Sequence, residues 1–158
     1  MDAFQLLKKD HQKVRDLFEE LAEIEASDTK NRKLVFDQIK HETEIHAQLE
    51  EEIFYPALAD ESETAELIEE AYKEHKEVKR TLQKLDKMDK NTEEWAELCS
   101  TLQETVELHV EEEENEIFKR AKEILTAEGL RELGKQLQLR KEELLPSKKE
   151  EPSQRRAR

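Results

Sequence analysis

One pattern occurs twice in this chain and limits its fold more than any other feature. His46 is followed four positions later by Glu50, and His109 is followed four positions later by Glu113. Four positions make about one turn of an α-helix, so each pair projects from one side of its helix. A single histidine lies 35 positions before the first pair and 34 before the second: His11 and His75. The chain therefore has a twofold internal repeat, with one copy in each half.

Residues that interrupt helices are rare. The 158 residues include only two glycines and three prolines, whereas 43% are charged and 35% are hydrophobic, a composition that favours long helices. Apolar residues recur in steps of three and four over four segments, about 2–26, 31–55, 63–88 and 93–125. We predict an all-α fold: an up-down-up-down antiparallel four-helix bundle over residues 1–125, a short C-terminal helix over 126–145 and a disordered basic tail over 146–158.

The four histidines of the repeat fill gaps in the apolar stripes, so they face the interior of the predicted bundle. The positions midway between 11 and 46, between 46 and 75 and between 75 and 109 all fall in predicted turns. Two positions equally far from the turn that joins their helices lie at the same height in an antiparallel pair. We therefore expect the histidines to form one layer, with Glu50 and Glu113 one turn along.

Imidazoles and carboxylates gathered in a dry layer cost on the order of several kcal/mol for each uncompensated charge, and a bound metal removes that cost. Their mixture suits iron, manganese or zinc better than copper(I) or calcium, and six donors are too many for one tetrahedral zinc. We predict two metal ions, each held by the two histidines of one half and bridged by both glutamates. Glu51 or Glu114 is expected to hold the outer nitrogen of a histidine. The predicted ligands are His11, His46, Glu50, His75, His109 and Glu113.

The residues around these positions resemble the hemerythrin-like family of HHE cation-binding domains. The matching stretches are Asp10-His11, His46 to Pro56, Glu74-His75 and His109 to Phe118, and the resemblance covers residues 1 to about 125. It implies a non-haem di-iron centre, with two iron ions as the cofactor, that is able to bind dioxygen. Manganese and zinc are the alternatives that the donor set leaves open.

The sequence departs from the oxygen-carrying members of that family. They bring a fifth histidine one turn from the third-helix histidine, and here Ala71 and Lys79 occupy those positions. The fourth-helix carboxylate, Glu113, follows its histidine by four positions, where the carriers use a more distant aspartate. The remaining histidine, His41, is expected on the surface. We therefore expect an open coordination position that water, peroxide, nitric oxide or Tyr72 could fill.

Charge and composition disfavour several classes of partner and compartment. The formal net charge of −14 disfavours nucleic acid and anionic membranes as partners. No apolar run approaches the ~20 residues of a membrane span, and the first residues do not resemble a signal peptide. The single cysteine, Cys99, fits a reducing compartment and is expected to be buried. We therefore expect a cytoplasmic protein.

Three functions are consistent with these patterns. The first is a binding protein rather than an enzyme: a di-iron bundle that binds dioxygen or a related diatomic or peroxide ligand, for sensing, storage or iron handling. The second is a di-iron enzyme that acts on peroxide or nitric oxide, or in iron–sulfur cluster repair, through the open position. The third is a metal-free helical adaptor, which the cost of the buried polar layer disfavours.

Overall fold

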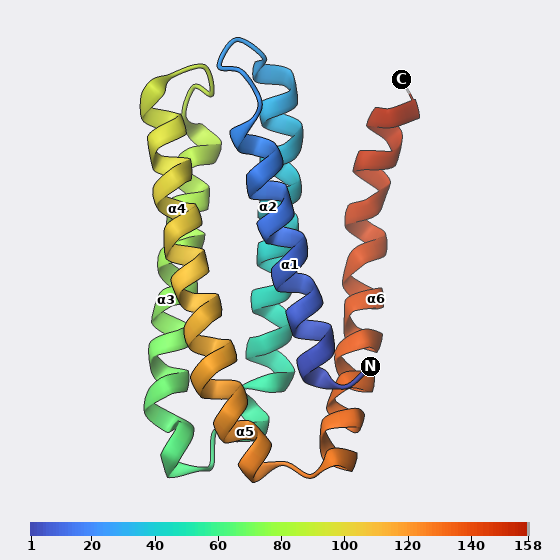
Figure 1. The fold of residues 1–158 in the computed structure, drawn as a ribbon. Helices are drawn as coiled ribbons and strands as arrows, with labels where there is room; N and C mark the ends of the chain where they lie inside the picture. The colour runs from blue at the N-terminus through green and yellow to red at the C-terminus, as the bar shows by residue number, and fades with distance from the viewer. Residues whose placement is uncertain (158) are drawn as a thin grey trace.

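Four long helical rods run antiparallel and form a bundle (Figure 1). The computed structural model describes the backbone of residues 1–157 and the side chains of residues 1–145. The first and third rods are single helices, α1 (Ala3–Ala22) and α3 (Ser62–Lys87). No strand occurs among the residues that the structure describes. The predicted all-α, up-down-up-down arrangement is therefore confirmed.

The second and fourth rods change helix type part-way along. Each passes from an α-helix into a π-helical turn that starts at the glutamate of a His-x-x-x-Glu pair. Such turns close an i→i+5 hydrogen bond and are frequent at functional sites. Sequence periodicity did not indicate them. The segments are α2 (Thr29–Leu49), η1 (Glu50–Phe54) and the 3-10 turn η2 (Pro56–Leu58) in the second rod, and α4 (Glu93–Glu112), η3 (Glu113–Ile117) and α5 (Phe118–Ile124) in the fourth.

Polar side chains define where several helices begin. The Asp2 carboxylate accepts a hydrogen bond from the backbone N–H of Gln5, and the Gln5 side chain accepts one from the backbone of Asp2. This capping box satisfies N–H groups that have no partner inside the helix. Asp28 caps α2 and Thr92 caps α4, each by a side-chain oxygen that accepts a hydrogen bond from one backbone N–H. The last two caps lie in the short connections at one end of the bundle (Figure 1).

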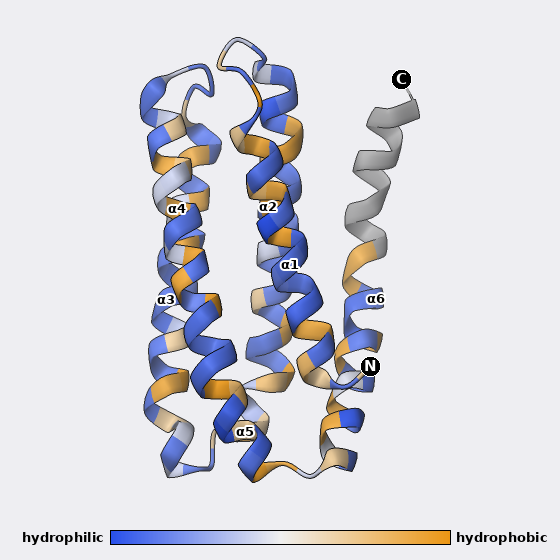
Figure 2. Ribbon diagram, viewed as in Figure 1, coloured by the Kyte–Doolittle hydropathy of each residue, from blue (hydrophilic) through white to orange (hydrophobic). Residues whose placement is uncertain are grey.

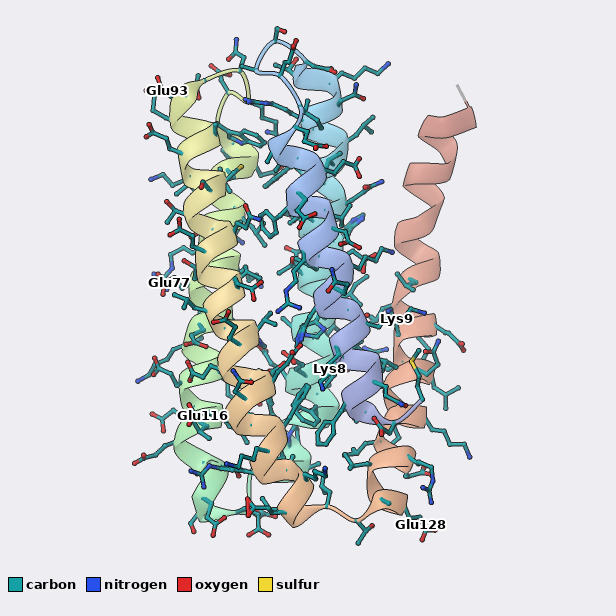
Figure 3. All side chains as sticks on the ribbon, viewed as in Figure 1. Lys8, Lys9, Glu77, Glu93, Glu116 and Glu128 are labelled. Atoms are coloured by element: carbon teal, nitrogen blue, oxygen red, sulfur yellow. The ribbon has the colours of Figure 1, made fainter. Side chains whose placement is uncertain are left out.

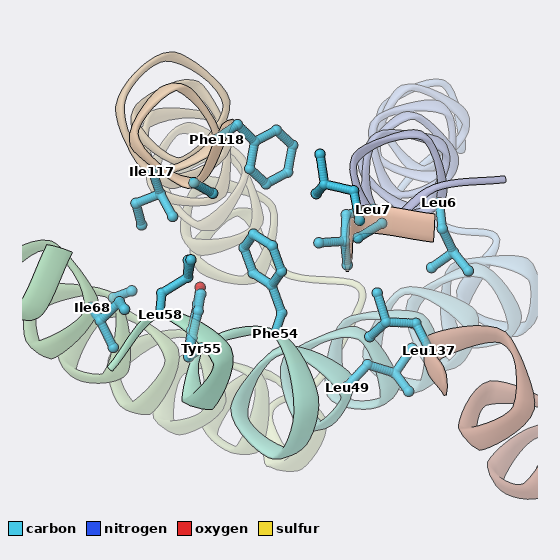
Figure 4. Close-up of a cluster of buried hydrophobic side chains, with 14 of the residues drawn as sticks. Leu6, Leu7, Leu49, Phe54, Tyr55, Leu58, Ile68, Ile117, Phe118 and Leu137 are labelled. Atoms are coloured by element: carbon cyan, nitrogen blue, oxygen red, sulfur yellow. The ribbon is translucent and has the colours of Figure 1, made fainter. Parts of the chain in front are cut away.

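Two separate apolar clusters fill the bundle, and the hydropathy colouring shows apolar segments along the inner faces of the rods (Figure 2). One cluster includes Phe54 and Phe118 and lies beside η1 and α5 (Figure 4). The other includes Phe36 and Trp95 and lies toward the capped connections. Full burial of one large apolar side chain contributes about 1.5–3 kcal/mol, so both clusters stabilise the bundle. The residues between the clusters are the histidines and glutamates of the repeat.

A further helix, α6 (Ala127–Ala157), lies against α1 and α2 (Figure 1). Leu137 is 0% exposed at this contact. At Gly134 the helix crosses the N-terminus so closely that a Cβ would lie 2.3 Å from the carbonyl oxygen of Met1. Only glycine permits this approach, because it has no Cβ. The prediction of a disordered tail falls on residues 146–158, whose side chains lie outside the described part of the chain.

The outer surface is densely charged. Side chains such as Lys9, Glu77 and Glu116 are exposed and point away from the bundle (Figure 3). Cys99 is buried, as expected, with 8% of its surface exposed. Within the part of the chain that the structure describes, no helix combines the length and the apolar character that crossing a bilayer requires.

Candidate metal centre

The structure brings the six predicted ligands together in one layer between the two apolar clusters. Each rod supplies one histidine, and the second and fourth rods each supply a glutamate at the first residue of a π-turn. Glu50 and Glu113 are both 0% exposed. Carboxylates are almost never fully buried unless they are paired, so this burial marks a polar site rather than ordinary core packing.

On one side of the layer, His11 and His46 face each other through their inner nitrogens. The two Nε2 atoms lie 3.1 Å apart. His11 Nε2 also lies 3.1 Å from Glu113 Oε1, and His46 Nε2 lies 3.1 Å from Glu50 Oε2. These four side chains form one group of potential ligand atoms, all within 4.8 Å of one another.

The other side of the layer repeats this arrangement with the second pair of histidines. His75 Nε2 lies 3.1 Å from Glu50 Oε1, and His109 Nε2 lies 3.8 Å from Glu113 Oε2. Glu50, His75 and His109 form the second group of potential ligand atoms. Each carboxylate therefore directs one oxygen toward each pair of histidines, which is the arrangement that a carboxylate bridging two metal ions requires.

The outer nitrogen of every histidine contacts a carboxylate outside the layer. A carboxylate acceptor keeps the proton on Nδ1 and leaves Nε2 free for a metal. Sequence reasoning anticipated Glu51 and Glu114 but missed Asp10 and Glu74, which occupy matching positions directly before the first histidine of each repeat. The Nδ1–oxygen distances are 3.1 Å for His46–Asp10, 2.7 Å for His75–Glu51, 2.5 Å for His109–Glu74 and 2.6 Å for His11–Glu114.

Ionised groups in the layer strongly shift one another's pKa values. Burial alone would lower the pKa of His46, but Glu50 and other carboxylates raise it well above its usual range. The same competition, with Glu50 and Glu51 outweighing burial, raises the pKa of His75 to about 9. Burial would raise the pKa of Glu50, yet His46 holds it well below its usual range. In the metal-free layer, protons on His46 and His75 therefore compensate the Glu50 carboxylate. By contrast, burial and the neighbouring Glu50 raise the pKa of Glu113.

Three buried atoms of the layer have no hydrogen-bond partner among the described residues: Glu50 Oε2, Glu113 Oε1 and His109 Nε2. The two oxygens lie within 3.1 Å of histidine nitrogens, but these contacts do not have hydrogen-bond geometry. Leaving a buried polar atom unsatisfied costs about 1–3 kcal/mol. A cation in each of the two groups of potential ligand atoms would satisfy these atoms, so the donor set fits metal ions.

Tyr55 is a part of the site that sequence reasoning missed. Its hydroxyl lies within hydrogen-bond distance of Glu113 Oε2 and of Glu50 Oε1, the latter at 3.1 Å, and can donate its one proton to either; it lies 3.5 Å from His75 Nε2. Tyr55 is fully buried, and burial followed by the two carboxylates raises its pKa well above the usual value. Tyr72 was one of four possible occupants of an open coordination position, with water, peroxide and nitric oxide, but its hydroxyl donates to the backbone carbonyl of Glu51 at 3.4 Å.

The π-turn explains why helical periodicity overlooked Tyr55. Tyr55 follows Glu50 by five positions, which would put them on different faces of an α-helix, whereas the turn closes a 2.7 Å hydrogen bond from Tyr55 N–H to the Glu50 carbonyl. The corresponding residue of the second repeat is Phe118. Tyr55 stacks on His75, and Phe118 stacks on His11, so at this position the two halves differ by one hydroxyl.

A cavity of about 660 Å³ adjoins the layer. Its inner wall includes the four histidines and the apolar side chains of Val14, Val78, Leu82, Val106 and Val110. The exposed residues on its lining, Glu52, Lys76 and Lys79, belong to η1 and α3. The cavity therefore opens to solvent beside η1 and α3, and its inner wall is formed in part by the histidines.

The positions that a fifth histidine would take hold no metal-binding side chain. Ala71 is buried, and Lys79 lies on the cavity lining. His41 is half-buried rather than on the surface, and it is not part of either group of potential ligand atoms. Four histidines, not five, therefore face the centre.

Comparison with known proteins agrees with this geometry. The family model of the hemerythrin HHE cation-binding domain matches residues 2–121. The chain belongs to the hemerythrin HHE family. A hemerythrin HHE cation-binding domain-containing protein from Mycobacterium kansasii has a similar crystal structure, with a TM-score of 0.83 and 26% sequence identity over 93% of this chain and 89% of that one. No curated protein matches the sequence.

Membership of the hemerythrin HHE family confirms the resemblance seen in the sequence motifs. Together with the convergent histidines and glutamates, it supports metal binding by this chain. The family match ends at residue 121, before α6 begins at Ala127.

Proposed function

We propose that this hemerythrin HHE chain holds two iron ions and binds dioxygen or a related diatomic or peroxide ligand at them, for sensing, storage or iron handling. The observation that carries the proposal is the position of Glu50, which is fully buried and directs one oxygen to each pair of histidines at 3.1 Å. Manganese and zinc are the alternative metals. The proposed ligands are His11, His46, Glu50, His75, His109 and Glu113.

The two metal positions would differ in their free coordination sites. The group around His11 and His46 includes both glutamates, whereas the group around His75 and His109 includes only Glu50. When bound, iron would supply a redox-active Lewis acid with an open position. The chain itself holds each imidazole in place through its outer carboxylate and supplies the partly apolar cavity. A small ligand would bind on the less saturated side, beside His75.

Anaerobic purification of the full chain with ferrous iron tests the proposal. We expect two iron ions per chain by metal analysis and an absorption band that appears in air and reverses when oxygen is removed. Glu50→Gln should reduce the content of both metals, because Glu50 belongs to both ligand groups. His41→Gln is the matched control and should retain them. A chain without metal whose melting temperature does not respond to a chelator would indicate a metal-free adaptor instead.

Tyr55 favours a second function, a di-iron enzyme that acts on peroxide or nitric oxide, with iron–sulfur cluster repair in the same class. Its hydroxyl contacts both carboxylates and can hold or deliver a proton beside His75. Tyr55→Phe should then abolish turnover of added peroxide while leaving the metal content unchanged, and Tyr72→Phe serves as the control. Equal turnover in the two variants would eliminate this role for Tyr55.

We also propose that the chain works in the cytoplasm and without nucleic acid or a membrane as partner. The single cysteine suits a reducing compartment, and the net charge of −14 repels anionic surfaces. Retention of the chain on an anionic vesicle or on DNA at physiological salt would contradict the second part of this proposal.

A further inference from the structure

The last described helix reaches the metal centre through one lysine. The Lys141 ammonium, on α6, donates to Asp10 Oδ1 at 2.6 Å. Asp10 Oδ2 in turn accepts from His46 Nδ1 at 3.1 Å. Asp10 is 5% exposed and the Lys141 side chain is 19% exposed, so solvent screens this pair only weakly. A continuous chain of polar contacts therefore runs from α6 to the outer nitrogen of His46, a predicted ligand.

This contact breaks the twofold symmetry of the centre. Glu74 is the counterpart of Asp10 in the second repeat and holds His109 in the same way. Among the residues whose side chains are described, no lysine or arginine forms an ion pair with Glu51, Glu74 or Glu114, and Asp10 alone of the four outer carboxylates has one. The asymmetry comes from α6, which has no counterpart in the first repeat.

The helix is held in place independently of Lys141. Leu137 is fully buried, and Gly134 allows close contact with the N-terminus. The neighbouring Arg140 forms a separate ion pair with Glu52 at 2.8 Å, which is exposed and does not touch a histidine. The contact between Lys141 and Asp10 is therefore not needed to keep α6 against α1.

A cation paired with the outer carboxylate changes how strongly the histidine donates electrons to a metal. The Lys141 charge weakens the pull of Asp10 on the Nδ1 proton of His46, so His46 Nε2 becomes a weaker electron donor. The same charge disfavours a higher positive charge on a metal nearby. Both effects favour the reduced state of an ion bound by His11 and His46.

We propose that Lys141 is a positioning residue of the metal centre, which couples α6 to His46 through Asp10 and raises the reduction potential of the ion at His11 and His46. The assignment of two redox-active ions rests on the proposed function. The coupling from Lys141 through Asp10 to His46 does not, because it exists in the metal-free protein.

The full chain without metal gives the first test. The nitrogen-15 and proton resonances of His46 Nδ1–H report the hydrogen bond to Asp10 directly. Lys141→Gln should shift them, Lys141→Arg should restore them toward the wild-type position, and Arg140→Gln should leave them unchanged. An unshifted resonance in Lys141→Gln overturns the proposal, and this result does not depend on whether the chain binds iron.

Redox titration of the iron-loaded full chain gives the second test, because a merely structural contact would not change one potential selectively. Mutation of a residue that holds a metal ligand typically costs about 10- to 100-fold in metal affinity or activity. Lys141 lies one contact further from the metal, so we expect an effect of about tenfold. Lys141→Gln should raise the oxidised-to-reduced ratio of one ion about tenfold at a fixed potential, which is about 59 mV for a one-electron step. Equal potentials in Lys141→Gln and Arg140→Gln overturn the proposal. Absence of iron from the wild type refutes the proposed function instead.

Discussion

Removing the metal should make the stability of this chain fall as the pH rises. In the metal-free layer, burial alone would lower the pKa of His75, but Glu50 and Glu51 raise it from 6.5 to about 9. A group whose pKa is higher in the folded state stabilises the fold while it is protonated. The contribution of His75 is therefore complete below pH 6.5 and is lost as the pH rises through 9.

The size of this effect follows from the two pKa values. One pKa unit is worth about 1.36 kcal/mol, so the rise from 6.5 to about 9 corresponds to on the order of 3 kcal/mol. The His75 side chain is 8% exposed, so solvent screens it little. Domains unfold with free energies of about 5–15 kcal/mol, which makes such a loss large. The pKa values of His11 and His46 are also raised, and their contributions have the same sign.

Urea unfolding of the chelator-treated chain measures this dependence. Trp95 is the only tryptophan and is 1% exposed, so its fluorescence reports unfolding. His75→Gln should lose its share of the pH dependence, whereas His41→Gln, outside the layer, controls for the loss of a histidine. With metal bound the trend should reverse, because the ligands must be deprotonated. A metal-free chain whose free energy of unfolding stays constant or rises between pH 6.5 and 9 would refute the reasoning.

Three further predictions concern substitution or labelling of single residues. Glu74→Gln should weaken metal binding about 10- to 100-fold in a chelator competition, because the His109 imidazole loses its charged outer partner; unchanged affinity would contradict this role. Gly134→Ala should lower the free energy of unfolding by about 1–3 kcal/mol, because the new Cβ would lie 2.3 Å from a backbone atom. Gly129→Ala is the control: its Cβ would meet only a side-chain oxygen at 3.2 Å, and it should not destabilise the chain. Burial raises the pKa of Cys99 to about 12, so a thiol reagent should label it only in urea; labelling of the native chain would show that this region opens.

Sequence pattern was sufficient for the fold and for the composition of the layer. Helical periodicity depends on neighbouring residues, so it could be read without knowing how the rods pack. The layer could be inferred because His11, His46, His75 and His109 lie at equal distances from the turns between them. Antiparallel helices convert those equal distances into equal heights.

Contacts between rods were decided only in three dimensions. The sequence shows that Asp10 precedes His11, but not that its carboxylate holds His46 on another rod. It likewise contains Lys141 without indicating that α6 brings it to Asp10. Such pairings depend on the rotation of each rod about its axis and on the direction of each side chain. Neither produces a periodic pattern in the sequence.

The sequence by itself therefore determined the four rods, the twofold repeat and the six side chains that face one another, because these follow from local spacing and symmetry. The tertiary structure decided which carboxylate holds which imidazole, and that Tyr55 rather than Tyr72 reaches the centre. For Tyr55 the physical reason is the π-turn that begins at Glu50, whereas the pairs of carboxylate and imidazole depend on how the rods are rotated about their axes. One extra residue in a helical turn rotates the residues after it about the helix axis. Phe54 and Phe118, which end or follow the two π-turns, are packed in the apolar cluster in the rotated positions.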